Sequence, residues 1–142
     1  ALPSLCLEGT NLLLLEMPFE HWSDYMIREV MDLARSRRFT LLMAHIERYY
    51  YDQPVSVWDD LLDQDVLMQS NADFFLGFLS RRKALRLLDQ GRIHLLGTDC
   101  HNMQNRPPRM DAARDMIARH LGGDVLDGID ELGRSILRKG SL

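Results

Sequence analysis

Short apolar runs alternate with segments of helical periodicity along the whole chain, and this alternation limits the folds open to it. Four runs have the length of a strand, and each is followed by at least one segment whose apolar residues recur at helical spacing. The strands are predicted at residues 11–17, 39–44, 66–69 and 93–98. The helices are predicted at residues 22–36, 57–62, 74–90, 107–121 and 125–136. Because strands that alternate with helices join in parallel through right-handed crossovers, the sequence predicts an α/β fold with four parallel strands.

Glycine and aspartate mark several of the expected boundaries. Gly91 follows the helix at residues 74–90, in the position where a left-handed cap is wanted, and Gly122 ends the next helix. Asp124 is expected to cap the last helix. Residues 1–10 contain few periodic positions and are expected to form an irregular entry segment.

The composition is that of an ordinary folded domain. Apolar residues make up 46% and charged residues 27% of the 142 positions, which is enough to form a core. We therefore predict a single domain over residues 1–142. The formal net charge of −4 gives no basic footprint, so nucleic acid is not an expected partner.

The cysteines and the apolar runs indicate the compartment. Cys6 and Cys100 show no repeated spacing, which argues against a disulfide framework and fits a reducing cytoplasm. The only long apolar run, residues 12–15, is far too short to cross a bilayer, so no membrane insertion is expected. We predict a cytoplasmic protein; the alternative is a fragment whose targeting signal, if any, lay upstream.

Polar side chains that bind metal ions follow three of the four predicted strands. Glu16 ends the first strand, His45 follows the second, and Asp99 and His101 follow the fourth. The carboxyl ends of parallel strands form the face where α/β proteins place their chemistry. Each side chain alone has an ordinary structural explanation, but their common position predicts a shared site. Mixed imidazole and carboxylate ligands select Mn²⁺, Fe²⁺ or Zn²⁺ rather than metals that prefer thiolates.

Two arginines accompany these candidate ligands. Arg48 lies three residues after His45, and Arg106 lies five residues after His101. A guanidinium is a permanently charged donor that suits a phosphate. A divalent ion polarises a phosphoryl oxygen and acidifies a bound water, and arginine neutralises the charge on the phosphoryl group as it transfers. The sequence therefore predicts metal-assisted hydrolysis of a phosphoester.

Cys100 and Arg106 also have the Cys-x5-Arg spacing of cysteine-dependent tyrosine phosphatases. That mechanism needs a loop whose backbone N–H groups surround the phosphate, usually with the help of glycine. The five intervening residues contain no glycine, and Pro107 and Pro108 remove two donors. Strand parity also turns Cys100 away from Asp99, so we expect Cys100 to be a small buried apolar residue.

Residues 44–49 (AHIERY) and residues 98–102 (TDCHN), followed by Arg106-Pro107-Pro108, resemble the PHP-family protein-tyrosine phosphatases of bacterial capsule and exopolysaccharide operons. The resemblance implies a distorted (β/α)7 barrel with a manganese-preferring metal centre. It also implies that the substrate is phosphotyrosine on the tyrosine kinase that regulates polysaccharide export. The residues that match the family's motifs would be the metal ligands Glu16, His45, Asp99 and His101 and the phosphate-binding Arg48 and Arg106.

The family opens with a strand leading to His-x-His, which this sequence lacks. The resemblance is therefore to the carboxyl-terminal portion of the barrel, with four of its strands. A partial barrel leaves strand edges unpaired, with residues 12–15 apolar on both faces, and this predicts a homo-oligomer. Two alternatives remain: a phosphatase for a small phosphomonoester, of the histidinol-phosphatase kind, and a non-catalytic fragment that binds metal or phosphate.

Overall fold

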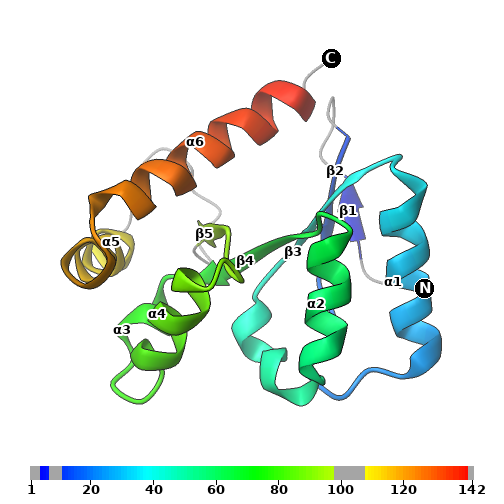
Figure 1. The fold of residues 1–142 in the computed structure, drawn as a ribbon, viewed down its shortest axis with the longest axis horizontal. Helices are drawn as coiled ribbons and strands as arrows, with labels where there is room; N and C mark the ends of the chain where they lie inside the picture. Colours follow the sequence, from blue (N-terminus) through cyan, green and yellow to red (C-terminus); the bar gives the residue numbers. More distant parts are fainter. Residues whose placement is uncertain (1–3, 7–10, 98–107, 141–142) are drawn as a thin grey trace. The chain divides into compact units, whose positions relative to one another are not determined.

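A computed structural model describes residues 4–6, 11–97 and 108–140, which form strands and helices in the predicted α/β order (Figure 1). The chain groups into two compact units. Unit 1 consists of Ala1–Met68 and Ser135–Leu142, and unit 2 consists of Gln69–Arg134. This grouping does not test the single domain predicted for residues 1–142, which stays a prediction.

Parallel strands form the centre of unit 1. β2 (Leu12–Leu15) pairs in parallel with β3 (Thr40–Met43), and β3 pairs in parallel with the first two residues of β4 (Leu67–Asn71). These strands confirm the first three predicted ones and are buried on alternate or on both faces, as apolar runs of this length require.

One further strand in unit 1 was not predicted. β1 (Ser4–Cys6) pairs antiparallel with β2, with Leu5 opposite Leu14. Three residues are too few to show an alternating pattern, so only the neighbouring strand reveals this one. Because β1 covers one edge of β2, the prediction that the apolar run at residues 12–15 lies at an open edge is wrong.

Unit 1 also contains two helices and two short 3-10 turns. α1 (Asp24–Ser36) begins where the Ser23 hydroxyl accepts a hydrogen bond from the Met26 backbone N–H, at 3.1 Å. α2 (Val55–Asp63) contacts α1, and Figure 1 shows the two helices side by side. The 3-10 turns η1 (Ile46–Arg48) and η2 (Tyr50–Asp52) lie between β3 and α2.

Unit 2 contains the remaining parallel pair and four helical segments. The last three residues of β4 pair in parallel with β5 (Leu95–Gly97), which confirms the fourth predicted strand. α3 (Asp73–Leu76), α4 (Arg81–Asp89) and α5 (Pro108–Leu121) pack against one another. α6 (Gly123–Gly140) begins in unit 2, and its residues from Ser135 onward belong to unit 1.

The single helix predicted at residues 74–90 is wrong, because α3 and α4 are separate helices. Gly77 has an extended backbone (φ −68°, ψ 135°) that ends α3. The Ser80 hydroxyl then donates to the Phe74 carbonyl at 2.8 Å, which holds the turn between the two helices. The apolar spacing continues across this break, so periodicity alone does not reveal it.

The glycine boundaries are confirmed. Gly91, with φ +75°, follows α4, and Gly122, with φ +94°, separates α5 from α6. Asp124 lies in the first turn of α6 rather than at its cap, where an acidic side chain still suits the helix dipole. Among the helices that the structure describes, none combines the length and the apolar character needed to cross a membrane.

Candidate functional site

Glu16 and His45 come together at the carboxyl ends of neighbouring parallel strands in unit 1. Leu15 lies opposite Met43 in the register, and the Ala44 backbone N–H extends the ladder by donating to the Leu15 carbonyl at 2.8 Å. The side chains that follow then approach, with Glu16 Oε1 3.8 Å from His45 Nε2. His45 is largely enclosed and Glu16 is exposed, at 22% and 61% of their side-chain surfaces. The structure thus brings together two of the predicted metal ligands.

The backbone of His45 has an unusual conformation. Its φ of 56° and ψ of 44° place it in the left-handed region, and its carbonyl accepts the first hydrogen bond of η1 from the Arg48 N–H, at 3.0 Å. Such a backbone is strained for any residue with a Cβ and persists only where the surrounding structure imposes it. Here two residues, Ala44 and His45, connect β3 to η1, and this short connection fixes the imidazole at the strand end.

Tyr49 stabilises the turn between β3 and η1. Its hydroxyl donates to the Ala44 carbonyl, and its ring is buried at 1% exposure against Trp22 and Trp58, with centroid distances of 5.3 and 6.1 Å. Burial raises the pKa of the Tyr49 hydroxyl far above its usual value, and the charges of Glu47 and Glu16 raise it further. Tyr49 is therefore a neutral donor that anchors the segment between Ala44 and η1.

Arg48 lies one turn beyond His45 and is exposed. Its guanidinium carbon is 5.9 Å from the ring centroid of Phe19, close enough for a cation–π contact. The Phe19 ring is itself 61% exposed and stacks on Tyr49 at 6.0 Å. Arg48 therefore presents an exposed cation three residues after His45, and the Phe19 ring limits the directions it can take.

Phe19 was not among the candidates drawn from the sequence. It lies in the segment that follows β2, 29 positions before Arg48 in the chain, and its ring contacts the Arg48 guanidinium. The sequence indicated only that Phe19 follows Pro18, in a segment where the predicted strand has already ended. This position does not predict which residue the Phe19 ring will contact, because the contact depends on how β2 and β3 align.

The Glu16–His45 pair fits a divalent cation. Metal ions lie about 2.1 Å from imidazole nitrogens and carboxylate oxygens, so one ion can contact both of two donors that are 3.8 Å apart. Within residues 11–97 and 109–136, no group of three or more His, Cys, Asp or Glu side chains is placed to hold an ion. The predicted ligands Asp99 and His101 and the predicted phosphate-binding Arg106 lie outside the described residues.

Comparisons with known proteins agree on one family. The family model described as "Capsular polysaccharide synthesis, CpsB/CapC" matches residues 3–132. The tyrosine-protein phosphatase CpsB of Streptococcus pneumoniae is 32% identical over 93 residues, which are 58% of this chain and 38% of that protein. The tyrosine-protein phosphatase YwqE of Bacillus subtilis is 24% identical over 139 residues, which are 94% of this chain and 54% of that protein.

One other curated relative carries a different name. A glycine/sarcosine N-methyltransferase of Halorhodospira halochloris is 32% identical over 90 residues, which are 63% of this chain and 31% of that protein. The chain thus spans from about a third to about a half of the length of these curated relatives.

A solved structure shares the fold. It comes from the crystal structures of YwqE from Bacillus subtilis and CpsB from Streptococcus pneumoniae, which are described as metal-dependent tyrosine phosphatases. The match has a TM-score of 0.79 at 23% identity and covers 97% of this chain and 57% of that one. This likeness and the strand pairing confirm the predicted α/β fold with four parallel strands, as part of the fold of that structure. Since the family model covers most of the sequence, the chain belongs to the CpsB/CapC family of capsular polysaccharide synthesis.

Proposed function

We propose that this chain carries part of the active site of a metal-dependent protein-tyrosine phosphatase. The observation that supports this most is the approach of Glu16 to His45, at 3.8 Å, with Arg48 one 3-10 turn further along. Two relatives are named tyrosine-protein phosphatases, which supports phosphotyrosine as the substrate class. The chain matches only part of each, so activity, substrate and partner are proposals.

Glu16 and His45 would hold the metal ion, through the carboxylate oxygen and Nε2 that already face each other. When bound, the ion would supply positive charge to a phosphoryl oxygen and acidify a water molecule. Arg48 would bind the phosphoryl oxygens, because its exposed guanidinium can approach a ligand while Phe19 restricts its orientation. The proposal also includes Asp99 and His101 as metal ligands and Arg106 as a second phosphate donor.

Several finer points belong to the same proposal. Mn²⁺ is the proposed metal, with Fe²⁺ and Zn²⁺ as alternatives for the same ligand types. The proposed substrate is phosphotyrosine on the tyrosine kinase that regulates polysaccharide export, and the proposed compartment is the cytoplasm. The predicted homo-oligomer stays a prediction, and since β1 covers one edge of β2, it depends on the other strand edges. Light scattering that gives a monomer at every concentration would contradict it.

Methyl transfer is not proposed. The similarity to the Halorhodospira methyltransferase involves 63% of this chain, whereas the family model matches residues 3–132 and the solved structure covers 97% of the chain. None of the described residues favours a methyl donor over a phosphate as the ligand.

The test is turnover of a phosphotyrosine peptide by the purified chain, with Mn²⁺, with a chelator, and with three variants. Arg48→Ala is expected to lower kcat/KM by about a hundredfold, since it removes a charged donor to the phosphoryl group. The matched control Arg28→Ala removes an exposed arginine from α1 and is expected to leave turnover unchanged. Cys100→Ser is also expected to leave it unchanged.

Each outcome decides between the alternatives. Turnover that is lost with chelator and retained in Cys100→Ser supports the proposal. Loss in Cys100→Ser would replace it with the cysteine mechanism. Activity on small phosphomonoesters alone would change the substrate class, and no turnover under any condition would leave a non-catalytic metal- or phosphate-binding segment.

A further inference from the structure

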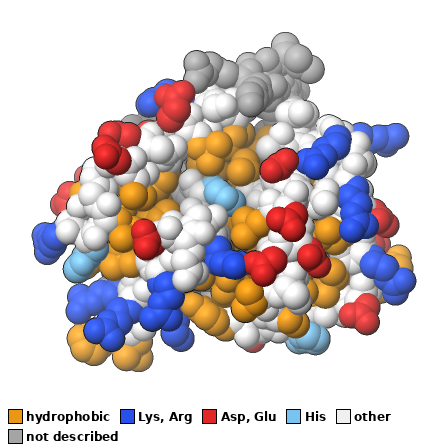
Figure 2. All heavy atoms as spheres, in the orientation of Figure 1, with side chains coloured by type: hydrophobic (Ala, Val, Ile, Leu, Met, Phe, Trp, Pro, Cys, Tyr) orange, Lys and Arg blue, Asp and Glu red, His pale blue; other side chains and the backbone are white. Residues whose placement is uncertain are grey.

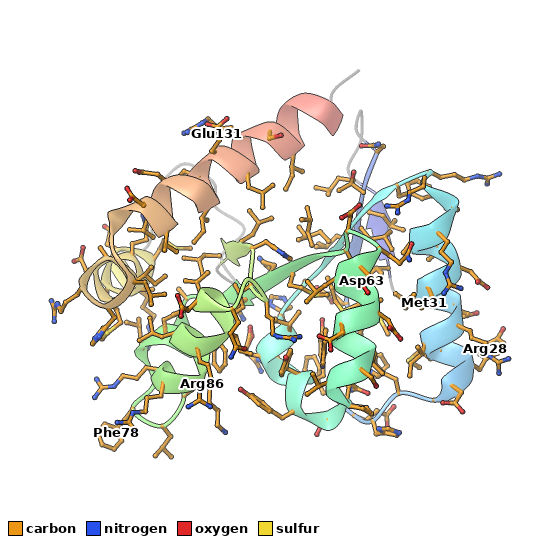
Figure 3. The ribbon with its side chains drawn as sticks, in the orientation of Figure 1. Arg28, Met31, Asp63, Phe78, Arg86 and Glu131 are labelled. Carbon is orange, nitrogen blue, oxygen red and sulfur yellow. The ribbon has the colours of Figure 1, made fainter. Side chains whose placement is uncertain are left out.

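The turn between α3 and α4 in unit 2 presents two large apolar side chains to solvent. Phe78 is 82% exposed and Leu79 is 86% exposed, more than any other large apolar side chain among the described residues. Figure 3 shows the Phe78 side chain pointing away from the ribbon at the tip of this turn. Full exposure of two adjacent large apolar residues is unfavourable in water, so it calls for an explanation.

The turn is held in place by its own hydrogen bonds. The backbone N–H groups of Ser80 and Arg81 both donate to the Gly77 carbonyl, at 3.2 and 2.9 Å, and the Ser80 hydroxyl donates to the Phe74 carbonyl. Phe75, at the other end of this short segment, is fully buried. The exposure of Phe78 and Leu79 is therefore a property of a fixed turn that is anchored in the core of unit 2.

Positively charged side chains follow these two residues on α4. The exposed cations of α4 begin directly after the turn and are Arg81, Arg82, Lys83 and Arg86. Residues 74–88 contain no Asp or Glu, although the chain as a whole has a net charge of −4. Figure 2 shows blue side chains gathered beside orange ones at the lower left, over α4 and the loop before it. The surface thus combines an apolar tip with four exposed cations, which Asp73 and Asp89 flank in the sequence.

One contact links the two properties. The guanidinium carbon of Arg81 lies 5.5 Å from the ring centroid of Phe78, over its face. The cation and the aromatic ring therefore face the same side of the turn. A ligand that meets Phe78 will also meet this positive charge.

We propose that the Phe78–Leu79 turn and the basic residues of α4 form a docking surface for an anionic lipid bilayer. Phe78 and Leu79 would enter the boundary between headgroups and acyl chains, and the arginines would lie among the lipid phosphates. The protein would rest on the bilayer without spanning it. This inference is independent of the proposed phosphatase function.

The shape of the surface favours a membrane over an acidic protein. A stable protein interface buries about 800 Å² on each partner around a packed apolar core. Here the apolar part is confined to two adjacent, highly exposed side chains at the tip of a turn (Figure 3). Such a tip can enter a soft apolar layer more readily than it can pack against a flat protein surface. Charge complementarity to anionic headgroups accounts for the lack of carboxylates in residues 74–88.

The test is cosedimentation of the purified chain with vesicles of phosphatidylcholine alone, or of equal parts phosphatidylcholine and phosphatidylglycerol. Binding is expected only to the anionic vesicles and is expected to weaken with salt. Replacing three arginines (Arg81→Gln, Arg82→Gln and Arg86→Gln together) should lower the partition coefficient about a hundredfold. Replacing the tip (Phe78→Ser with Leu79→Ser) should lower it about tenfold or more.

Matched controls remove the same groups elsewhere. Arg28→Gln, Arg35→Gln and Arg38→Gln together remove three exposed cations from around α1, so the net charge changes equally. Tyr51→Ser with Val55→Ser removes two apolar side chains that are each 57% exposed. Both controls are expected to bind anionic vesicles like the parent chain, and circular dichroism checks that every variant is folded.

Insertion of the tip can be observed directly with Phe78→Trp. The native Trp22 and Trp58 are both 1% exposed, so a tryptophan at the tip adds a distinct solvent-exposed emission. Its emission should shift to the blue on addition of anionic vesicles. Absence of vesicle binding would overturn the proposal in favour of a surface for an acidic protein. Vesicle binding that the tip and arginine variants do not weaken, or that gives no blue shift, would equally overturn it.

Discussion

The backbone of His45 shows how the candidate site is formed from a single residue. Its left-handed conformation turns the chain from β3 into η1 and leaves Nε2 facing Glu16. A residue without a Cβ would adopt this backbone more easily, so the imidazole is present at some expense of stability. This pattern is typical of a functional site, where strain is kept because the side chain is needed.

The first prediction follows from this strain. His45→Gly should be more stable than His45→Ala by about 1 kcal/mol, because alanine retains the Cβ that disfavours φ 56° while glycine does not. Urea unfolding of the two variants measures the difference, and both have lost the imidazole equally. An alanine variant as stable as the glycine variant would mean that His45 does not hold this backbone conformation in solution.

The second prediction concerns Tyr49. Tyr49→Phe removes the hydroxyl that donates to the Ala44 carbonyl inside the protein, and should lower the free energy of unfolding by about 1–2 kcal/mol at neutral pH. Tyr25→Phe, at a side chain with 68% exposure, is the control and should have almost no effect. Denaturant unfolding measures both.

The Tyr49 pKa gives this prediction a pH dependence. Burial raises the pKa in the folded protein above the value of about 10 in the unfolded chain, so the folded state retains a proton that the unfolded state releases. The stability that Tyr49 contributes is complete below pH ~10 and is lost as the pH rises above it. The difference between wild type and Tyr49→Phe should therefore shrink by about 1 kcal/mol at pH 11. A difference that stays constant with pH would contradict the burial of the hydroxyl.

At the scale of secondary structure, the break between α3 and α4 determines the surface of unit 2. A Cβ added at Gly77 would collide with the Ser80 hydroxyl, which is the group that donates to Phe74. The turn that exposes Phe78 and Leu79 therefore depends on glycine at one end and serine at the other.

The third prediction is a coupling between these two positions. Gly77→Ala should destabilise the chain by about 1–2 kcal/mol, because the new methyl group displaces the Ser80 hydroxyl. In a Ser80→Ala background that hydroxyl is already gone, so the same substitution should be milder by about 0.5 kcal/mol or more. A double-mutant cycle from urea unfolding tests this, and strictly additive effects would show that the two residues do not meet.

The fourth prediction concerns the pairing of α5 with the part of α6 in unit 2. Arg114 donates two hydrogen bonds to the Asp130 carboxylate, at 2.9 and 2.8 Å. Hydrogen bonding to Asp130 is the main reason why the pKa of Arg114 is raised. Asp130→Asn should lower stability by about 1–2 kcal/mol, since a bidentate charged pair loses an acceptor. Glu131→Gln, whose carboxylate pairs with Arg134 on the exposed surface of α6, should cost about 0.5 kcal/mol or less. Equal effects in thermal unfolding would contradict this ranking.

The order of strands and helices was predictable from the sequence, and some of their boundaries were not. The apolar runs of β2 and β3 and the periodicity of α1 are local signals that tertiary contacts then reinforce. β1 is only three residues long and depends on β2 for its identity. The break at Gly77 depends on a side-chain hydrogen bond that spacing does not encode.

At the scale of the whole molecule, the sequence predicted that polar groups at neighbouring strand ends would lie close together, and the structure places Glu16 3.8 Å from His45. Their role as metal ligands stays a prediction. The rule that parallel strands place their carboxyl ends at one edge was sufficient for this pair. The contact of Phe19 with Arg48 and the anchoring by Tyr49 could not be predicted, because both depend on packing between residues distant in the chain. Asp99, His101 and Arg106 lie outside the described residues, so their roles stay predictions.

The most direct test of the account is Mn²⁺ binding by the purified chain, measured by isothermal titration calorimetry. The wild-type chain should bind Mn²⁺, and Glu16→Gln and His45→Gly should each weaken the affinity about tenfold or more, because each removes one of the two facing donors. His120→Ala, at an exposed position in α5, should bind as the wild type does. Equal affinities in all four proteins, or no binding by the wild type, would contradict the claim that Glu16 and His45 share a metal ion.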